Sequence, residues 1–180
     1  NGNFESDQTS WQNWSATDNQ GSIGQEARVD TSSAYAGTKA LHMFDSAAKV
    51  RTVWQDVTIS GNSSYTITAA IKAQKIGVGQ ARIVLEWRSG GTVVGTANLG
   101  SDTVGSTNYQ IKSGTFSSPA TATVLRIKPM LGIVVLGGDN DAEYWIDEVT
   151  LVKFQPVISL VSNGNFESDQ TSWQNWSATD

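Results

Sequence analysis

Apolar and polar residues alternate along much of this chain with a period of two. The stretch Val50–Ile59 places Val53 and Val57 on one face and Thr52 and Asp56 on the other. Successive side chains of a β-strand point to opposite faces of its sheet, so this pattern predicts a half-buried strand. A sustained period of 3.6, which would indicate helices, is hard to find in the sequence.

The same pattern recurs in short segments that are rich in β-branched and aromatic residues. They are Ser64–Ala73, Ala81–Ser89, Thr92–Leu99, Asn108–Phe116, Thr121–Leu131 and Ala142–Phe154. Gly61–Asn62 predicts a turn that joins the first two strands as a hairpin, and Gly90–Gly91 predicts another turn. Eight to ten strands with turns at short intervals predict an all-β protein, a two-sheet antiparallel jelly-roll β-sandwich.

The first eighteen residues recur letter for letter at the end of the chain. Asn1–Asp18 is identical to Asn163–Asp180, an offset of 163 − 1 = 162 residues. This period has the size of a whole domain, not of a short solenoid repeat. We therefore predict one repeat unit at residues 1–156, with its boundary at Pro156. Residues 157–180 are then the first strand and the start of the next identical repeat, and Asn1 begins part-way along such a strand.

The composition excludes several classes of function. The net charge of −5 provides no basic surface for nucleic acid, and the absence of cysteine excludes disulfides and thiolate metal sites. The longest apolar run, Met130–Gly138, is too short for membrane insertion. Only 16% of the residues are charged, while Ser, Thr, Asn, Gln and Gly are abundant. This balance is typical of secreted β-proteins and predicts an extracellular or cell-surface location.

Several motifs carry a resemblance to a known family. In order along the chain they are Asn1–Glu5, Trp11, Gly37–Met43, Val53–Ala73, Ala81–Gly95 and Tyr144–Val152. Together they resemble the carbohydrate-binding modules of families four, nine and twenty-two. The resemblance implies a jelly-roll β-sandwich, found beside glycosidases and on bacterial surfaces. It implies the fold better than the ligand, because extracellular repeat proteins with no demonstrated sugar share the same motifs.

The resemblance also implies a structural calcium ion, held by a carboxylate from the first strand and one from the last. Carried over to this sequence, the ligands are Glu5 and Asp147, with backbone carbonyls near Gly37–Lys39. Asp147 shares its alternation phase with Val149 and Leu151, which predicts an inward carboxylate. A buried carboxylate needs a metal or several hydrogen-bond donors. The alternative is therefore a carboxylate satisfied by backbone N–H groups or a nearby lysine.

One tryptophan stands out as a candidate for sugar binding. Trp11 and Trp87 are predicted to lie in the core, whereas Trp54 is out of phase with Val53 and Val57 and falls on the polar face. Sugars stack their C–H faces on such rings while polar side chains bind the hydroxyls. The predicted site comprises Trp54, Arg82, Glu86 and Arg126, with Tyr35 and Tyr109 from loops. Alternatively, a loop or a neighbouring repeat covers this face.

The sequence gives little support for catalysis. The single histidine, His42, lies among apolar residues and is predicted to belong to a strand. There is no Ser-His-Asp order, phosphate-binding loop or zinc-protease motif. We therefore predict a protein that is not an enzyme.

Two candidate functions remain, and the exact repeat decides which of them we prefer. The first is a structural or adhesive repeat of an extracellular filament, sheath or large surface protein, joined head to tail to identical repeats through its terminal strand. The second is a carbohydrate-binding module that recognises a polysaccharide through aromatic stacking. Identical repeats favour the first, because one junction must fit every next junction.

Overall fold

The computed structural model describes residues 2–5, 15–16, 27–45, 50–74, 80–102, 108–132 and 142–154. Within these ranges the chain forms ten strands and no helix, and therefore no helix that could cross a membrane. The strands are β1 (Ser15–Ala16), β2 (Ala27–Asp30), β3 (Ala40–Asp45), β4 (Val50–Thr58), β5 (Ser64–Gln74), β6 (Gln80–Ser89), β7 (Thr92–Asp102), β8 (Gln110–Ser117), β9 (Val124–Gly132) and β10 (Ala142–Lys153).

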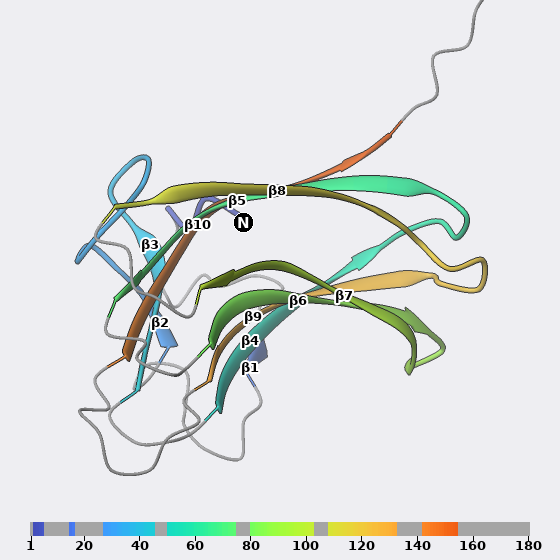
Figure 1. Cartoon of the computed structure of the whole chain (residues 1–180), viewed down its shortest axis with the longest axis horizontal. Coiled ribbons are helices and arrows are strands. Elements are labelled where there is room, and N and C mark those ends of the chain that lie inside the picture. Colours follow the sequence, from blue (N-terminus) through green and yellow to red (C-terminus); the bar gives the residue numbers. More distant parts are fainter. Residues whose placement is uncertain are drawn as a thin grey trace, which may run out of the picture.

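The strands form two antiparallel sheets that pack face to face (Figure 1). The first sheet has the order β1-β4-β9-β6-β7, and the second has the order β2-β3-β10-β5-β8. Most consecutive strands alternate between the two sheets, as in a jelly roll. The predicted two-sheet antiparallel sandwich is therefore confirmed.

The predicted hairpin at Gly61–Asn62 is wrong, although both of its strands exist. Strand β4 pairs with β9, whereas β5 pairs with β8 and β10 in the other sheet. The turn carries the chain across the sandwich, where the N–H of Ile59 donates to the carbonyl of Thr123 at 3.0 Å. Alternation shows which face of a strand is buried, but it does not name the pairing partner. By contrast, the turn at Gly90–Gly91 joins β6 to β7 as paired neighbours.

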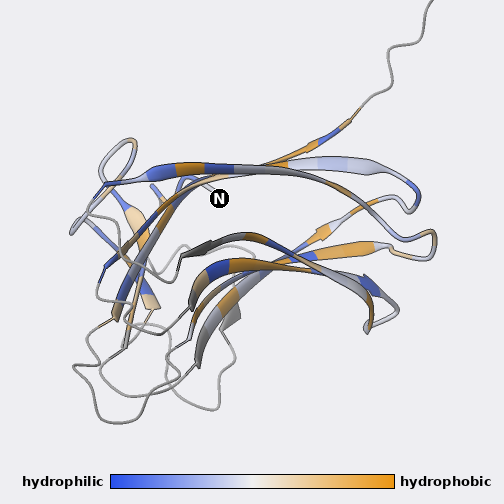
Figure 2. Cartoon of the chain, viewed as in Figure 1, coloured by the Kyte–Doolittle hydropathy of each residue, from blue (hydrophilic) through white to orange (hydrophobic). Residues whose placement is uncertain are grey.

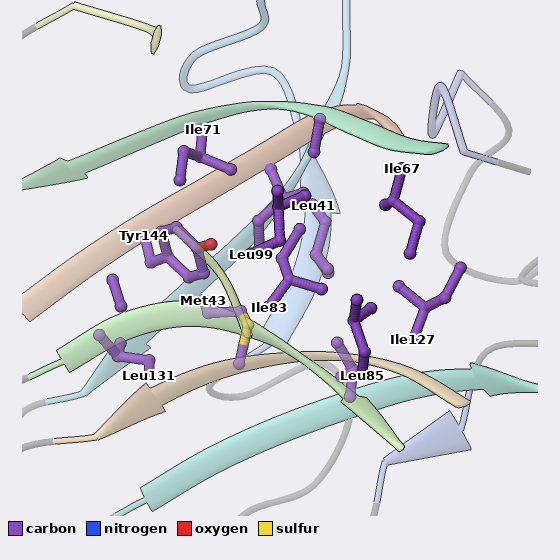
Figure 3. Packing of buried hydrophobic residues seen from close by; sticks show 14 of the residues in the cluster. Leu41, Met43, Ile67, Ile71, Ile83, Leu85, Leu99, Ile127, Leu131 and Tyr144 are labelled. Atoms are coloured by element: carbon purple, nitrogen blue, oxygen red, sulfur yellow. The ribbon is translucent and has the colours of Figure 1, made fainter. Parts of the chain in front are cut away.

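The core lies between the two sheets and consists of the inward residues of both. The side chains that meet there include Ile67, Ile71 and Tyr144 from one sheet and Leu85, Ile127 and Leu131 from the other (Figure 3). Polar positions alternate with these apolar ones along the strands (Figure 2). Trp87 is 3% exposed and belongs to the same cluster, which confirms its predicted place in the core.

A bulge in β10 changes which residues of this strand face the core. Ile146 is in the core, and so is the side of the strand that carries Val149 and Leu151. The register with β5 shifts after Asp147, and Glu148 has φ 48°. The extra residue reverses the alternation, as bulges do. Asp147 is therefore buried on the outer side of the sheet, and its predicted inward orientation is wrong.

The N-terminal residues dock against this bulge. Residues 2–5 form a turn, not the predicted end of a strand, and the N–H of Val149 donates to the carbonyl of Gly2 at 2.8 Å. Phe4 is fully buried within the core cluster. Residues 155–180, with the boundary at Pro156 and the strand predicted for the next repeat, lie outside the described residues. Trp11 lies outside them as well.

Candidate functional site

The outer face of the first sheet carries a row of polar side chains across four strands. The register places Asp56 of β4 opposite Arg126 of β9, Arg126 opposite Glu86 of β6, and Glu86 opposite Thr96 of β7. These residues alternate with the buried residues of their strands and so point away from the core. Strands β6 and β7 arch in Figure 1, and the hollow of the arch is turned away from the second sheet.

Trp54 lies on this outer face beside the polar row. The guanidinium of Arg126 stands over its indole ring, 4.7 Å from the centroid. Asp56 fixes this cation through two hydrogen bonds, from Nε at 2.7 Å and from Nη2 at 2.8 Å. One face of the indole is therefore covered by a cation, while the residue as a whole stays partly exposed.

The carboxylates of the face are held ionised by cations. Hydrogen bonding to Arg126 lowers the pKa of Asp56 below its ordinary value. Burial alone would raise the pKa of Glu86, but Lys128 and Arg88 lower it overall through hydrogen bonds and charge. Nη1 of Arg88 lies 2.8 Å from Glu86, and Nζ of Lys128 contacts the other oxygen of the same carboxylate. Two cations share the single Glu86 carboxylate, so the ion pairs of this face leave an excess of positive charge.

Arg82 lies at the far side of the same face. It is opposite Met130, which is in turn opposite Thr52, two residues before Trp54 on β4. The Nε atom of Arg82 is buried and has no hydrogen-bond partner in the described part of the chain. A buried donor without a partner is costly.

The predicted sugar-binding residues divide into two groups. Trp54, Arg82, Glu86 and Arg126 come together on the outer face of the first sheet. Tyr35 and Tyr109 lie instead beside the second sheet, where their rings pack edge to face with centroids 5.7 Å apart. The hydroxyl of Tyr109 donates to the carbonyl of Ser33 at 3.1 Å, and the N–H of Tyr35 donates to Asp147. The two tyrosines are therefore not partners of Trp54.

Sequence reasoning missed Lys128, which completes the charge network of the first face. The sequence could have indicated Lys128, because it follows Arg126 by two residues and therefore lies on the same face of β9. The residues that were missed on the second sheet form a separate cluster around Trp145, on the outer side of that sheet.

Trp145 of β10 is packed under the loop that follows β2. It is 4% exposed, and its Nε1 donates to the hydroxyl of Ser32 at 2.9 Å. The ring of His42 stacks on it with centroids 4.6 Å apart, and Nζ of Lys72 lies 4.6 Å from its centroid. Asp30 accepts a hydrogen bond from the Ser32 hydroxyl and lies 2.8 Å from Nδ1 of His42. The cluster ties the loop to the sheet.

The Ser32, His42 and Asp30 side chains do not form a nucleophilic triad. Such a triad needs the serine on Nε2 of the histidine and the carboxylate on Nδ1. Here both Ser32 and Asp30 approach Nδ1, at 3.4 and 2.8 Å. Nε2 is buried without a hydrogen-bond partner among the described residues. His42 is a buried residue of β3, as its apolar neighbours predicted.

The two carboxylates predicted to bind calcium reach the same loop, residues 31–39, from two segments. Asp147 accepts hydrogen bonds from the N–H groups of Tyr35, Ala36 and Glu148 at 2.8 to 3.1 Å. Glu5 accepts hydrogen bonds from the N–H groups and a hydroxyl at residues 38–39 at 3.0 to 3.2 Å. The backbone groups that meet these oxygens are N–H donors, whereas calcium is bound by oxygen ligands such as carboxylates and backbone carbonyls.

This donor set does not fit a calcium ion, and it matches the alternative of carboxylates satisfied by N–H groups. The described residues also contain no cluster of three or more acidic or histidine side chains that could hold a metal. Burial raises the pKa of Asp147 despite its backbone donors, and the charge of Glu5 adds to this rise. Hydrogen bonds from Lys39 and Thr38 lower the pKa of Glu5. Calcium at Glu5 and Asp147 stays a prediction from the resemblance.

Known proteins resemble this chain in structure, although none of them matches it in the sequence comparisons. No family model matches the sequence, and no curated protein matches it. Among solved structures, a family 16 carbohydrate-binding module is similar, with a TM-score of 0.60 and 19% identity over 84% of this chain and 96% of that one. The CBM22-1 xylan-binding domain of Paenibacillus barcinonensis Xyn10C has a TM-score of 0.58 and 18% identity over 84% of this chain and 90% of that one.

The chain has the fold of these modules. A family 22 module of Clostridium thermocellum Xyn10B is also similar, with a TM-score of 0.59 and 17% identity over 87% of this chain and 92% of that one. The resemblance expected from the sequence motifs is thus confirmed at the level of the fold. The same fold lies within an enzymatically active domain of a bacteriophage CBA120 tailspike protein, at 11% identity. Function must therefore be argued from this chain's own residues.

Proposed function

We propose that this protein is a non-catalytic, extracellular carbohydrate-binding module that recognises a polysaccharide on the outer face of its first sheet. The observation that carries this proposal is the partly exposed Trp54, held beside a network of ion-paired side chains on an arched sheet. A partly exposed aromatic ring offers a surface for the C–H groups of a sugar. The solved modules with this fold support the same function.

The charged side chains on this face are fixed by ion pairs. Arg126 is paired with Asp56, while Arg88 and Lys128 are both paired with Glu86. Groups fixed in this way serve as hydrogen-bond donors and acceptors for hydroxyls. Arg82, which is partly exposed on the same face, is the group we expect to bind a sugar oxygen.

A panel of soluble polysaccharides, with xylan, mannan and β-glucan among them, tests the proposal. We expect Trp54→Ala to weaken binding of the recognised polymer by about tenfold or more, since a stacked aromatic anchor dominates such contacts. Tyr35→Ala is the matched control: Tyr35 is 50% exposed but lies beside the other sheet, so its loss should leave affinity unchanged. Isothermal titration or affinity electrophoresis measures both variants.

Two results would contradict the proposal. One is a wild-type protein that binds none of the polymers, and the other is a Trp54→Ala variant that binds as tightly as the wild type. A loss of affinity in Tyr35→Ala alone would move the site to the second sheet.

A second candidate function is a structural or adhesive repeat of an extracellular filament, which the exact repeat at Asn163–Asp180 favours. The structural observation that supports it is the docking of residues 2–5 against β10, because the docked residues recur at Gly164–Glu167. Negative-stain electron microscopy of the concentrated protein is the test. Filaments would support this function, and particles of single-molecule size at every concentration would exclude it.

A further inference from the structure

The first residues of the chain bind to the sandwich in the manner of a docked peptide. Phe4 has no exposed surface and lies in the core cluster. The carbonyl of Gly2 accepts a hydrogen bond from the N–H of Val149 at 2.8 Å. The carboxylate of Glu5 accepts hydrogen bonds from Thr38 and Lys39, and Nζ of Lys39 donates to the carbonyl of Glu5 at 3.1 Å. We call the surface that receives residues 2–5 the docking site.

The docking site is selective for the residues that occupy it. A Cβ on Gly2 would lie 2.0 Å from the carbonyl oxygen of Val149, so only glycine fits there. A Cβ on Gly37 would lie 2.3 Å from the Glu5 carboxylate, so the loop is shaped around this acidic side chain. Phe4 has φ 53°, an unfavourable region for a bulky residue that the surrounding contacts must offset.

The chain contains a second segment that meets all of these requirements. Asn163–Glu167 has the same sequence as Asn1–Glu5, with Gly164, Phe166 and Glu167 at the contact positions. Within one copy of the chain the docking site is already occupied by residues 2–5. Phe154, the last described residue, is at the end of β10, five residues beyond Val149 and so about 17 Å along the strand from the docking site. In the sequence, the second segment therefore comes after the C-terminal end of β10, and this end of the strand is distant from the docking site of its own copy.

We propose that the docking site recognises the sequence Asn-Gly-Asn-Phe-Glu itself, and that its second occupant is Asn163–Glu167 of another copy of this chain. Exchange of an identical segment between copies is domain swapping, and the second segment has the residues that the docking site selects. In the wild type the first segment is tethered close to the site, at an effective concentration in the millimolar range, so it excludes the second at micromolar protein. Loss of the first segment from the site lets the second link two copies head to tail.

The decisive experiment removes the first segment from competition without changing the docking site. In the double variant Gly2→Ala, Phe4→Ala the first segment can no longer dock, whereas Val149, Thr38 and Lys39 are unchanged. We expect this variant to self-associate in sedimentation velocity as its concentration rises. Adding Gly164→Ala and Phe166→Ala should abolish the association. The variant with Gly164→Ala and Phe166→Ala alone is the matched control and should sediment as the wild type.

A second measurement covers the case in which the double variant folds poorly. A synthetic peptide with the sequence Asn163–Asp180 is added to the variant that carries all four substitutions, and the melting temperature is followed. We expect the peptide to raise it in a saturable manner, and a peptide with Gly164→Ala and Phe166→Ala to have no effect.

Two outcomes would overturn the proposal. If the double variant stays monomeric and is as unstable as the fourfold variant, and the peptide does not bind, the docking site does not accept the second segment. If the double variant is monomeric but more stable than the fourfold variant, the second segment docks within its own copy, and the link between copies is wrong. Neither outcome depends on carbohydrate binding, which is measured separately on the first sheet.

Discussion

The two outer faces of the sandwich carry the same arrangement, a tryptophan with a cation over its ring, in different surroundings. On the first sheet Arg126 lies 4.7 Å from the ring centroid of Trp54, and on the second sheet Lys72 lies 4.6 Å from that of Trp145. Trp54 is partly exposed, whereas Trp145 is 4% exposed beneath the loop after β2. The pairing of a cation with an aromatic ring therefore does not identify a binding site. Access to the ring does.

The difference between the faces comes from the loops, not from the strands. Trp145 gives its Nε1 proton to Ser32, and Asp30 receives hydrogen bonds from the Ser32 hydroxyl and from Arg28. These contacts hold the loop over the ring, so the aromatic surface stabilises the fold. The Trp54 ring has a cation on one face, and its polar neighbours are fixed by ion pairs within the sheet.

Replacing Trp145 should have the largest effect on stability. We expect Trp145→Ala to lower the free energy of unfolding by about 3 kcal/mol, because it leaves a cavity beneath the loop and removes one hydrogen bond to Ser32. Urea unfolding followed by circular dichroism measures the change. A loss below about 1 kcal/mol would mean that the loop does not depend on the ring.

The acid sensitivity of the second face should follow Asp30. Burial alone would raise its pKa, but hydrogen bonds from Ser32, Arg28 and His42 lower it from 3.8 to about 2. A carboxyl group whose pKa is lower in the folded state stabilises the protein above its unfolded pKa, and this contribution is lost as the pH falls from about 4 to about 2.

Thermal melts between pH 2 and pH 7 check this expectation. Asp30→Asn should be less stable than the wild type at neutral pH and should lose less stability on acidification. Asp56→Asn on the first face is the matched comparison, with a smaller effect because the Asp56 side chain is 44% exposed. Equal acid sensitivity of the wild type and Asp30→Asn would show that another carboxylate controls the acid limb.

Replacing Trp54 should cost little stability, in contrast to Trp145. We expect Trp54→Ala to change the free energy of unfolding by about 1 kcal/mol or less, since the ring is partly exposed and its main contact is a surface cation. The same urea titration provides the value. A loss as large as that of Trp145→Ala would assign Trp54 to the fold and weaken the proposed binding face.

Chelation should have the smallest effect of all. Because N–H donors already satisfy Glu5 and Asp147, we expect the melting temperature to be the same in excess chelator as in millimolar calcium. Differential scanning calorimetry measures both conditions. A clear rise with calcium that is lost in Asp147→Asn would support the calcium site implied by the family resemblance.

The alternation of apolar and polar residues was sufficient to predict most of the strands. It located β4 to β10 to within a few residues, it placed Trp87 in the core, and it placed Trp54, Arg82, Glu86 and Arg126 on polar faces. It failed at two points where non-local structure intervenes. The turn at Gly61–Asn62 crosses between sheets, and the bulge in β10 reverses the phase after Asp147. The local alternation does not identify the pairing partner of a strand, and it does not show where an extra residue is inserted.

What the sequence by itself determined is therefore the class of the fold, the buried side of strands β4 to β6, and the exact repeat of its first eighteen residues. The first two follow from the two-residue period of side chains along a strand, and the third follows from the identity of the two segments in sequence. Only the tertiary structure decided which polar residues share a face, that Tyr35 and Tyr109 lie apart from Trp54, and that residues 2–5 dock against β10. The physical reason is that these relations depend on contacts between segments far apart in the chain, which burial and hydrogen bonding select only when both sheets are assembled.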